Sequence, residues 1–340
     1  MKISVIIVNW NGKHWLKKSI PALYRSNVKN FEVVVVDNGS SDGSEEYIRR
    51  YYPQVKLVRL GRNVGFAAAN NVGYKSVSGG YIYFLNNDAI VRKDTLSKLA
   101  SYLDKNVQVG GVQSKIFSLR HKNRLDSAGS FLTNTGFLFH YGYLQKDGKK
   151  YAKTLDIFSA KGASMMFKRK VINKTGLFDD AYFAYFEESD FCHRVWLAGY
   201  SVKYFPAAAV DHWIGATSNR IDSSFIQFHA YKNRIRSYLK NLGTAELIKI
   251  LPVHVSLALG IATVMFLKGN RGVSVSIIRA LLWNVYMLPG TLRKRKIVQR
   301  RIRTRSDNDF LPVVHASVGY RYYMSQLFKN HSSYREPTIA

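Results

Sequence analysis

Four short runs of apolar residues organise the amino-terminal part of the chain. They span residues 3–8, 31–36, 55–60 and 81–85. Two of these runs are nearly continuous in apolar side chains, as is typical of strands that are covered on both faces. We therefore predict four β-strands in this part of the chain.

Helix-like stretches separate the predicted strands, for example at residues 13–26 and 44–52. Asp42 followed by Glu45 has the spacing of a capping box, which marks the start of a helix. Strands that alternate with helices predict an α/β fold with a mostly parallel central sheet and right-handed crossovers. In such sheets, ligands bind beyond the carboxyl ends of the strands.

The residues that follow the predicted strands are all polar and turn-forming. They read Asn9-Trp-Asn-Gly12, Asp37-Asn-Gly-Ser-Ser-Asp-Gly43, Gly61-Arg-Asn-Val-Gly65 and Asn86-Asn-Asp88. Each of them alone is explained by turn geometry, which favours Gly, Asn and Asp. Four consecutive strand ends of the same type favour a single crevice of nucleotide size.

The pattern becomes more mixed beyond residue 100. Two strand-like stretches and one helix-like stretch follow, at residues 156–167, 200–205 and 187–198. We see no internal repeat and no low-complexity linker before residue 215. We therefore expect residues 1–215 to form one catalytic domain and residues 216–340 to form a C-terminal helical appendage.

The appendage contains a long apolar segment. Residues 250–267 carry no charge across 18 positions, close to the roughly 20 residues that span a bilayer. Residues 273–292 have apolar side chains at helical spacing, and a basic tract follows at 292–305. Apolar helices beside clustered Lys and Arg are typical of attachment to an anionic membrane surface. We expect such interfacial attachment; a single span over 250–267 and an ordinary buried core are the alternatives.

The whole chain is strongly basic. Lys and Arg number 51 against 22 Asp and Glu, a net charge of +29, which predicts an anionic partner: nucleic acid, phospholipid headgroups or a phosphorylated substrate. The single cysteine, Cys192, excludes an intramolecular disulfide and a Cys-rich zinc site, and it favours a reducing compartment. The apolar stretch at the amino terminus is too short for a signal peptide.

Two carboxylates at strand ends need an explanation in so basic a protein. Asp88 could hold a divalent cation, because Mg²⁺ and Mn²⁺ prefer oxygen ligands and bridge carboxylates to substrate phosphates. It could equally cap the helix that is expected to begin near Lys93. Asp37 would repel phosphates and fits better at the base or ribose edge of a nucleotide, unless it only forms an Asx-turn into Asn38.

Three acids gather among aromatic residues in Tyr185-Phe-Glu-Glu-Ser-Asp190. On a helix, Glu187 and Asp190 are neighbours, while Glu188 points elsewhere. Neighbouring carboxylates in a partly apolar site raise one another's pKa, which suits a general base near neutral pH. Acids at the start of a helix are also explained by the helix dipole alone.

One histidine follows a further strand-like stretch at residues 207–210. Imidazole binds divalent ions readily, so His212 could complete a metal site with Asp88. A single histidine is more often structural, and the spacing leaves both interpretations open.

Taken together, these segments resemble glycosyltransferase family 2, whose members are inverting, metal-using enzymes with a GT-A fold. The resemblance covers about residues 3–215 and points to the rhamnosyltransferase-like branch. It rests on six segments in the family's order: VIIVNWNG, VVVVDNGSSDGS, GRNVGFAAANNVG, FLNNDA, GLFDDAYFAYFEESDFCHRVWLAGYSVKYFP and DHWIGATS. The sequence departs from the family in two places. The metal motif keeps only its final carboxylate, and a Glu-Glu pair replaces the usual Glu-Asp.

The resemblance implies roles for the matched positions. Asp88 would bind Mg²⁺ or Mn²⁺ on the diphosphate, with His212 as a candidate further ligand. Glu188 would be the catalytic base, with Glu187 as the alternative base, and Glu187 and Asp190 would support it or contact the acceptor. The residues that would bind the nucleotide-sugar donor are Asn9, Asp37, Asn63, Gly65, Asn70, Asn87 and Asp88.

The expected activity is transfer of a sugar from a nucleotide-diphosphate donor, dTDP-rhamnose or a UDP-sugar, to a hydroxyl group of a glycan or polyprenyl-linked glycan. Such a transfer belongs to cell-wall or polysaccharide biosynthesis. We expect a cytoplasmic protein that is peripheral on the inner face of the cell membrane. The sequence has neither a Gln-x-x-Arg-Trp motif nor an array of membrane spans, which argues against a processive polysaccharide synthase.

Two alternatives from other classes stay open. The first is a basic nucleic-acid-binding protein, but the strand-end acids would repel phosphates without a metal, so we expect no nucleic-acid partner. The second is an inactive transferase-like membrane scaffold. The acids that are retained at the matched positions argue against it.

Overall fold

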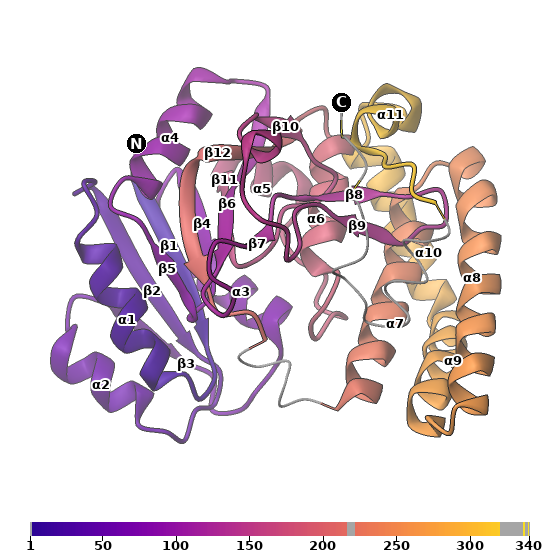
Figure 1. Cartoon of the computed structure of the whole chain (residues 1–340), viewed down its shortest axis with the longest axis horizontal. Helices are drawn as coiled ribbons and strands as arrows, with labels where there is room; N and C mark the ends of the chain where they lie inside the picture. Colours follow the sequence, from indigo (N-terminus) through magenta and orange to yellow (C-terminus); the bar gives the residue numbers. More distant parts are fainter. Residues whose placement is uncertain (1, 216–221, 320–335, 337–338, 340) are drawn as a thin grey trace.

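The structure, a computed structural model, describes residues 2–215 and 222–319 together with residues 336 and 339. A twisted, mixed sheet of ten strands forms its centre. Helices cover both faces of this sheet, and a group of C-terminal helices extends beyond one side of it (Figure 1). The α/β fold with a mostly parallel sheet and a helical C-terminal part is therefore confirmed.

The four predicted amino-terminal strands are present and parallel. They are β1 (Ile3–Asn9), β2 (Phe31–Asp37), β3 (Lys56–Arg59) and β4 (Tyr81–Leu85). The connecting helices are α1 (Lys13–Tyr24), α2 (Ser44–Tyr51) and α3 (Phe66–Lys75). Alternate residues of β1 belong to different core clusters: Ile6 shares one with Ala67 and Ala69 of α3, and Val5 shares the other with Leu16 and Ile20 of α1. This explains why nearly every residue of the run is apolar.

The second half of the sheet mixes parallel and antiparallel pairs. It contains β5 (Ala89–Val91), β6 (Val109–Ser118), β7 (Leu125–Ser127), β10 (Leu155–Asp156), β11 (Ser164–Lys168) and β12 (Ser201–His212). Eight strands of the sheet follow the order β10-β12-β6-β11-β4-β1-β2-β3, while β5 pairs with β12 and β7 pairs with β6. A separate two-stranded ribbon is formed by β8 (Ser130–Leu132) and β9 (Leu138–His140). The remaining helices of this half are α4 (Thr95–Lys105), η1 (Lys149–Tyr151), α5 (Arg169–Thr175) and α6 (Glu187–Leu197).

Two local predictions are wrong and one needs refinement. Gly43, with a φ of 76°, is the N-cap of α2, so Asp42 and Glu45 form no capping box; Asp42 instead accepts from the Lys13 amide at 2.8 Å. The strand predicted at 156–167 is two strands, β10 and β11. The residues between them form a loop. The strand-like stretches at 200–205 and 207–210 are one strand, β12, which is bulged between Phe205 and Ala209.

The C-terminal helices are joined to the rest of the protein by α7 (Ser223–Asn241), which packs against α6 on one side and α9 on the other. The helices that follow are α8 (Thr244–Leu267), α9 (Arg271–Tyr286), α10 (Leu288–Ile297), η3 (Val298–Ile302), η4 (Asp307–Asp309) and α11 (Leu311–Val314). The division into domains 1–215 and 216–340 stays a prediction, although α6 and α7 share a buried interface.

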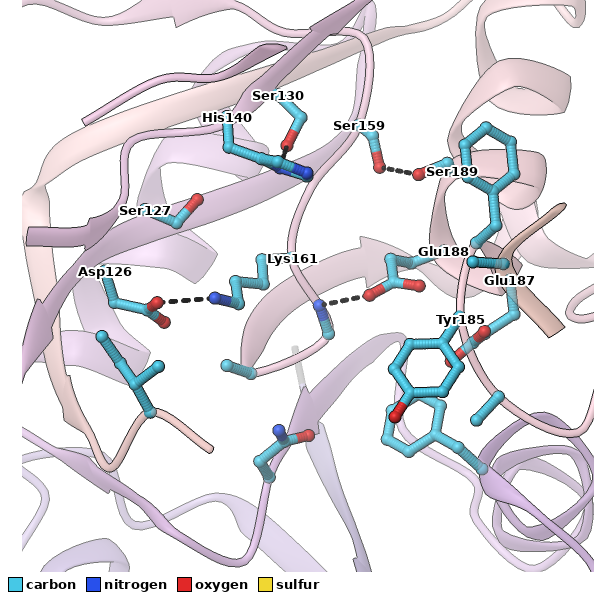
Figure 2. A pocket seen from close by; sticks show the side chains of 18 of the residues that line it. Asp126, Ser127, Ser130, His140, Ser159, Lys161, Tyr185, Glu187, Glu188 and Ser189 are labelled. Carbon is cyan, nitrogen blue, oxygen red and sulfur yellow. Dashed lines mark hydrogen bonds and ion pairs between the residues drawn. The ribbon is translucent and has the colours of Figure 1, made fainter. Parts of the chain in front are cut away.

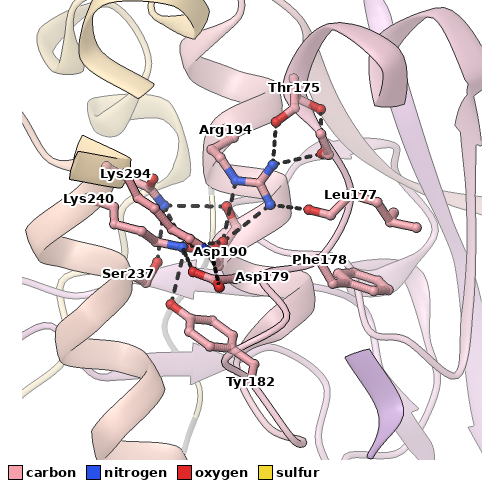
Figure 3. Close-up of polar contacts among 12 residues, drawn as sticks. Thr175, Leu177, Phe178, Asp179, Tyr182, Asp190, Arg194, Ser237, Lys240 and Lys294 are labelled. Carbon is pink, nitrogen blue, oxygen red and sulfur yellow. Dashed lines mark hydrogen bonds and ion pairs between the residues drawn. The ribbon is translucent and has the colours of Figure 1, made fainter. Parts of the chain in front are cut away.

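A buried network of ion pairs fastens this interface (Figure 3). Asp179 accepts from Arg236, Lys240 and Lys294, and burial alone would raise its pKa, but these three cations lower it far below the ordinary value. Lys240 also pairs with Asp190 of α6 at 3.0 Å. Because each buried charge has a partner, loss of one of them would leave others uncompensated.

The predicted apolar segment lies within α8. By length and composition α8 is the one helix among the described residues that is long and apolar enough to cross a membrane, with a mean hydropathy of 2.1 over its most apolar window. Only 22% of that window is buried. The stretch predicted at 273–292 is divided between α9 and α10. Helix α9 and the segment Leu288–Ile302, which joins α10 and η3, bend by 65°, and this bent pair would meet the same criteria if it formed one span.

The basic tract at 292–305 is partly internal. Lys294 pairs with Asp179, Arg295 donates to the carbonyls of Leu239 and Leu242, and Arg303 pairs with Asp307. These cations stabilise the protein itself. The exposed cations that remain in the tract are Arg293, Lys296, Arg300 and Arg301.

Candidate active site

A cavity of about 880 Å³ opens where β1 and β4 end (Figure 2). Its walls come from the loop between β10 and β11, from the start of α6, from β9 and from one face of α7. The ends of parallel strands place polar side chains at this edge, and the loop and helices close it from above. Several residues from distant parts of the chain line this single space: Asn38, Asn63, Asn86, Asn87, Asp88, Glu187, Glu188 and His212.

An amide chain connects three strand ends beneath the cavity. Asn87 Nδ2 donates to Asn9 Oδ1 at 2.8 Å, and Asn9 Nδ2 donates to Asp37 Oδ2 at 3.3 Å and to Ser40 Oγ at 3.1 Å. The second Asp37 oxygen accepts from the Ser40 amide at 2.8 Å, as in the turn that the sequence allowed. Asn9 and Asp37 are therefore buried behind the cavity, and only Asn87 reaches its surface.

Gly65 marks a second point where the chain is tightly fitted. Its φ of 88° and the Phe183 carbonyl, 2.3 Å from where a β-carbon would stand, both require glycine. Asn63 Oδ1 accepts from the Gly65 amide at 2.9 Å, and both residues line the cavity. The predicted donor residue Asn70 does not line it, because its side chain is buried and donates to the Phe66 carbonyl.

Four side chains of alternating charge line one wall. Lys161 Nζ lies 2.6 Å from Asp126 Oδ1, whose other oxygen is 2.8 Å from His212 Nδ1. The opposite ring nitrogen, His212 Nε2, is 3.1 Å from Asp88 Oδ1. Burial would lower the pKa of His212, but the bonds to Asp126 and Asp88 raise it to about 9. Burial would raise the pKa of Asp126, but Lys161 and His212 lower it well below its ordinary value.

The residues around Asp88 fit a divalent cation that is shared with a diphosphate. Asp88 Oδ1 is buried and, apart from the imidazole, has no hydrogen-bonding partner among the residues that the structure describes. Within the same residues, no three His, Cys, Asp or Glu side chains are grouped to hold a metal. One carboxylate and one imidazole suit an ion that takes its other ligands from substrate phosphates and water. Asp88 does not cap α4, whose N-cap is Asp94.

Glu187 and Glu188 begin α6 on the opposite side of the cavity from Asp126 (Figure 2). Glu188 Oε1 accepts from the Gly162 amide at 3.3 Å, whereas Glu187 Oε2 is buried without a partner among the described residues. Burial and then the charge of Glu188 raise the pKa of Glu187 well above its ordinary value. Burial also raises the pKa of Glu188, although the Gly162 bond and Lys161 oppose the rise. Both acids are thus made more basic.

The turn before α6 is held in an uncommon conformation. Tyr185 and Phe186 both have a φ of 71°, which costs free energy for residues with a side chain. Asn233 of α7 holds this turn: its Nδ2 donates to the carbonyls of Ala184 and Tyr185 at 2.9 and 2.7 Å. The helix that follows the predicted catalytic domain therefore positions the acids at the start of α6.

Asp190 does not belong to this cavity, which corrects the prediction that it is catalytic. Its carboxylate is fully buried one turn further along α6, where it pairs with Lys240 and Arg194 and accepts from Asn241 at 2.9 Å. These partners, rather than an acceptor, hold it ionised, and its pKa stays below the ordinary value despite burial. Asp190 connects the catalytic helix to α7.

The sequence analysis missed several residues of the cavity, among them Asp126, Ser130, His140, Lys161, Gly162 and Arg234. Asp126 lies in a strand of only three residues, and Lys161 and Gly162 lie in a loop. None of the three is therefore surrounded by a periodic pattern of apolar residues that would reveal its position. The only signal was an acid followed by Ser-Ala-Gly in a basic chain. The last residues of the segment DHWIGATS, 216–218, lie outside the described residues.

The sheet order and the acids at its edge define the GT-A class of nucleotide-sugar transferases. The family model described as Glycosyl transferase family 2 matches residues 4–176, about half of the chain. The chain belongs to glycosyl transferase family 2. The assignment to its rhamnosyltransferase-like branch stays a prediction.

Curated relatives agree with membership of glycosyl transferase family 2. The low-salt glycan biosynthesis hexosyltransferase Agl10 of Haloferax volcanii is 24% identical over 241 residues, 68% of this chain and 74% of that protein. The stretches that match three uncharacterized Rickettsia glycosyltransferases span only 18%, 21% and 22% of those longer proteins.

Solved structures show the same fold. Residues 1–349 of S. aureus TarS, in complex with UDP-GlcNAc, superpose with a TM-score of 0.57 at 18% identity, covering 88% of this chain and 91% of that one. The mannosyltransferase PcManGT of Pyrobaculum calidifontis, in complex with GDP-Man and Mn²⁺, superposes with a TM-score of 0.53 at 15% identity, covering 98% and 88%.

Proposed function

We propose that this protein is an inverting glycosyltransferase that moves a sugar from a nucleotide-diphosphate donor to a hydroxyl group of a glycan or lipid-linked glycan. The observation that carries the proposal is that Asp88 and Glu188 line the same cavity. Asp88 follows strand β4, and Glu188 lies in the first turn of α6. Donors in complex with TarS and PcManGT are both nucleotide sugars, which supports this substrate class. dTDP-rhamnose and UDP-sugars remain the donors to test first.

The strand ends would receive the donor. Asn63, Gly65 and Asn87 supply amide groups at the cavity surface, and Asn9 and Asp37 hold Asn87 in place from behind. Asp88 and His212 would hold Mg²⁺ or Mn²⁺, which when bound neutralises charge on the leaving diphosphate. The Mn²⁺ in the PcManGT complex supports this choice of ion. For His212 to serve as a ligand, its Nε2 must be free of a proton, so Asp126 would fix the ring through Nδ1.

Glu188 would act as the general base. Its carboxylate takes the proton from the acceptor hydroxyl, and that oxygen forms a bond to the anomeric carbon as the bond to the diphosphate oxygen breaks. Attack from the face opposite the diphosphate inverts the anomeric centre. A base with a raised pKa takes the proton more readily near neutral pH, and the Gly162 amide fixes the direction of Glu188. Glu187 would orient the acceptor, and it remains the alternative base.

The exposed face of α8 and α9 supports attachment to the cytoplasmic surface of the cell membrane. Leu267, Leu282, Val285 and Tyr286 are 78%, 62%, 70% and 83% exposed. Large apolar side chains that stay exposed on neighbouring helices are typical of contact with a membrane or a partner. Exposed cations of the 292–305 tract lie next to this face in the sequence and would attract anionic headgroups.

A screen of sugar nucleotides tests the proposed function directly. The purified chain is incubated with Mn²⁺ and with dTDP-rhamnose, UDP-GlcNAc, UDP-galactose or GDP-mannose, and release of the nucleoside diphosphate is measured. We expect one nucleotide class to be hydrolysed slowly and to stabilise the protein against heat. Stabilisation by oligonucleotides in place of every nucleotide sugar would instead favour the nucleic-acid alternative.

A further inference from the structure

One cation at the cavity, Arg234, has no anionic partner among the residues that the structure describes. The helix α7 carries Lys232, Arg234, Arg236 and Lys240 along its buried length. Lys232 donates to the Ala181 carbonyl, and Arg236 and Lys240 pair with Asp179. Arg234 makes no hydrogen bond and no ion pair with any residue that the structure describes, and its Nε is buried without a partner. The chain outside the described residues contains no Asp or Glu that could pair with it.

Aromatic rings hold this guanidinium at the cavity. Its central carbon lies 4.8 Å from the ring centre of Phe137, 5.4 Å from that of Phe186 and 5.6 Å from that of Tyr231. Stacking of this kind fixes the plane of an arginine but leaves its N–H groups to other acceptors.

The position of Arg234 connects the cavity with the apolar helices. Tyr231, one of its stacking partners, belongs to a buried cluster with Ala258 and Ala262 of α8 and Ile277 of α9. Phe137 packs against the same cluster. Arg234 therefore lies where the transferase cavity meets the helix pair whose outer side is apolar and exposed. A group that enters from a membrane surface would meet Arg234 on its way to Glu188.

We propose that Arg234 binds a phosphate group of the acceptor, at a subsite between Glu188 and the apolar helix pair. This inference rests on the proposed function and adds the chemical class of the acceptor to it. A planar guanidinium pairs with two oxygens of a phosphate at once, and a low-dielectric site strengthens that pair. The donor diphosphate belongs to the opposite side of the cavity, at Asp88. The acceptor phosphate would thus bind at Arg234, separately from the donor diphosphate at Asp88.

Binding of a short lipid phosphate to the full chain tests the subsite. Citronellyl phosphate is titrated by calorimetry in the presence of saturating UDP and Mn²⁺, which keeps it out of the donor site. Three compounds serve as controls. Citronellol lacks the phosphate and tests whether the charge is needed, and glycerol 1-phosphate lacks the lipid chain and tests whether the chain is needed. Glucuronate carries a carboxylate and tests whether phosphate is preferred to another anion. Arg234→Gln, Arg234→Lys and the control Arg279→Gln are compared. Arg279 also stacks on an aromatic ring, that of Phe228, but does not line the cavity.

We expect citronellyl phosphate to bind at least ten times more weakly to Arg234→Gln than to the wild type, and several times more weakly to Arg234→Lys. Arg279→Gln should bind it normally, and all variants should bind UDP with Mn²⁺ normally. Equal binding of glycerol 1-phosphate would place the phosphate in a soluble glycan rather than a lipid. Should Arg234→Gln fold poorly, Arg234→Lys, which keeps the charge, carries the comparison.

Three results would overturn the subsite: binding of citronellol as tight as that of citronellyl phosphate, binding of glucuronate as tight as that of either phosphate, or normal phosphate binding by both Arg234 variants. If the wild type binds no nucleotide but binds phosphate through Arg234, the proposed transferase function is rejected and the phosphate subsite is retained.

Discussion

Asp88, at the end of β4, and Glu188, in the first turn of α6, face the same cavity although they are far apart in the sequence. The fold brings them together because β4 is central in the sheet. Asn233 of α7 also fixes the turn before α6 by donating to the Ala184 and Tyr185 carbonyls. One side of the cavity therefore carries groups suited to a diphosphate, and the other side carries carboxylates suited to an acceptor hydroxyl.

The choice of base can be decided by two conservative variants. Glu188→Gln should lower kcat by roughly 10² to 10⁴, because a general base contributes about that much, while UDP binding stays normal. Glu187→Gln should lower kcat less and raise the acceptor KM. Turnover is measured with the donor that the screen identifies. If Glu187→Gln is the inactive variant and Glu188→Gln turns over well, the base is Glu187.

The pH profile should respond to Lys161. Its positive charge lowers the pKa of Glu188, so in Lys161→Gln that pKa should rise. A general base works only when it is ionised, and the acidic limb of kcat against pH should therefore move to higher pH. Lys203→Gln serves as the control, because Lys203 pairs with Asp156 away from the cavity. An acidic limb that stays in place, or moves to lower pH, would mean that Lys161 does not act on the base.

Stability should depend strongly on the buried ion pairs of Asp179. Asp179→Ala leaves Arg236, Lys240 and Lys294 without this partner, and should reduce the free energy of unfolding by roughly 3–5 kcal/mol. Asp94→Ala, which breaks an exposed pair with Lys98, should cost less than about 1 kcal/mol. Urea unfolding followed by circular dichroism compares the two. Similar losses in both variants would show that the network contributes little.

Membrane attachment should depend on the exposed side of α9. Replacing Leu282, Val285 and Tyr286 together by serine should greatly reduce sedimentation of the protein with phosphatidylglycerol vesicles, because their apolar area is exposed in solution. Tyr51 and Val107 are as exposed but lie elsewhere, so the double serine variant at these positions is the matched control. Cosedimentation that is unchanged in the α9 variant would argue against this face.

Removal of the C-terminal helices would not test membrane attachment cleanly. Deletion of residues beyond 240 removes Lys294, Asn241 and Arg303, which bond to Asp179, Asp190 and the end of α7. Loss of vesicle binding could then follow from unfolding. Surface substitutions avoid this problem because they leave the buried network intact.

Much of the fold was predictable from local pattern. The runs of β1, β2 and β4 are mostly buried, so their sequences are largely apolar, and the polar residues at their ends mark the site edge. The short strand β3 differs, because both of its end residues are charged and exposed. The loop after β10 was mistaken for a strand because Ile157, Phe158 and Ala160 are buried without being in the sheet. Burial, rather than strand pairing, makes that segment apolar.

The unpredicted parts of the site depend on contacts between distant segments. Asp190 has the spacing of a catalytic acid, and only the position of Lys240 on α7 shows that it is structural. The fold brings Asp126 and Lys161 within 2.6 Å of each other, and the buried Arg234 Nε has no hydrogen-bonding partner among the described residues. No periodicity in the sequence reports such partners.

The most direct measurement is calorimetric binding of the nucleoside diphosphate that the donor screen identifies, with and without Mn²⁺, to the wild type, Asp88→Ala and Glu188→Gln. We expect Mn²⁺ to tighten this binding at least tenfold in the wild type and in Glu188→Gln, and we expect the gain to disappear in Asp88→Ala. The proposed roles would be refuted by a gain from Mn²⁺ that survives in Asp88→Ala, or by nucleotide binding that is lost in Glu188→Gln.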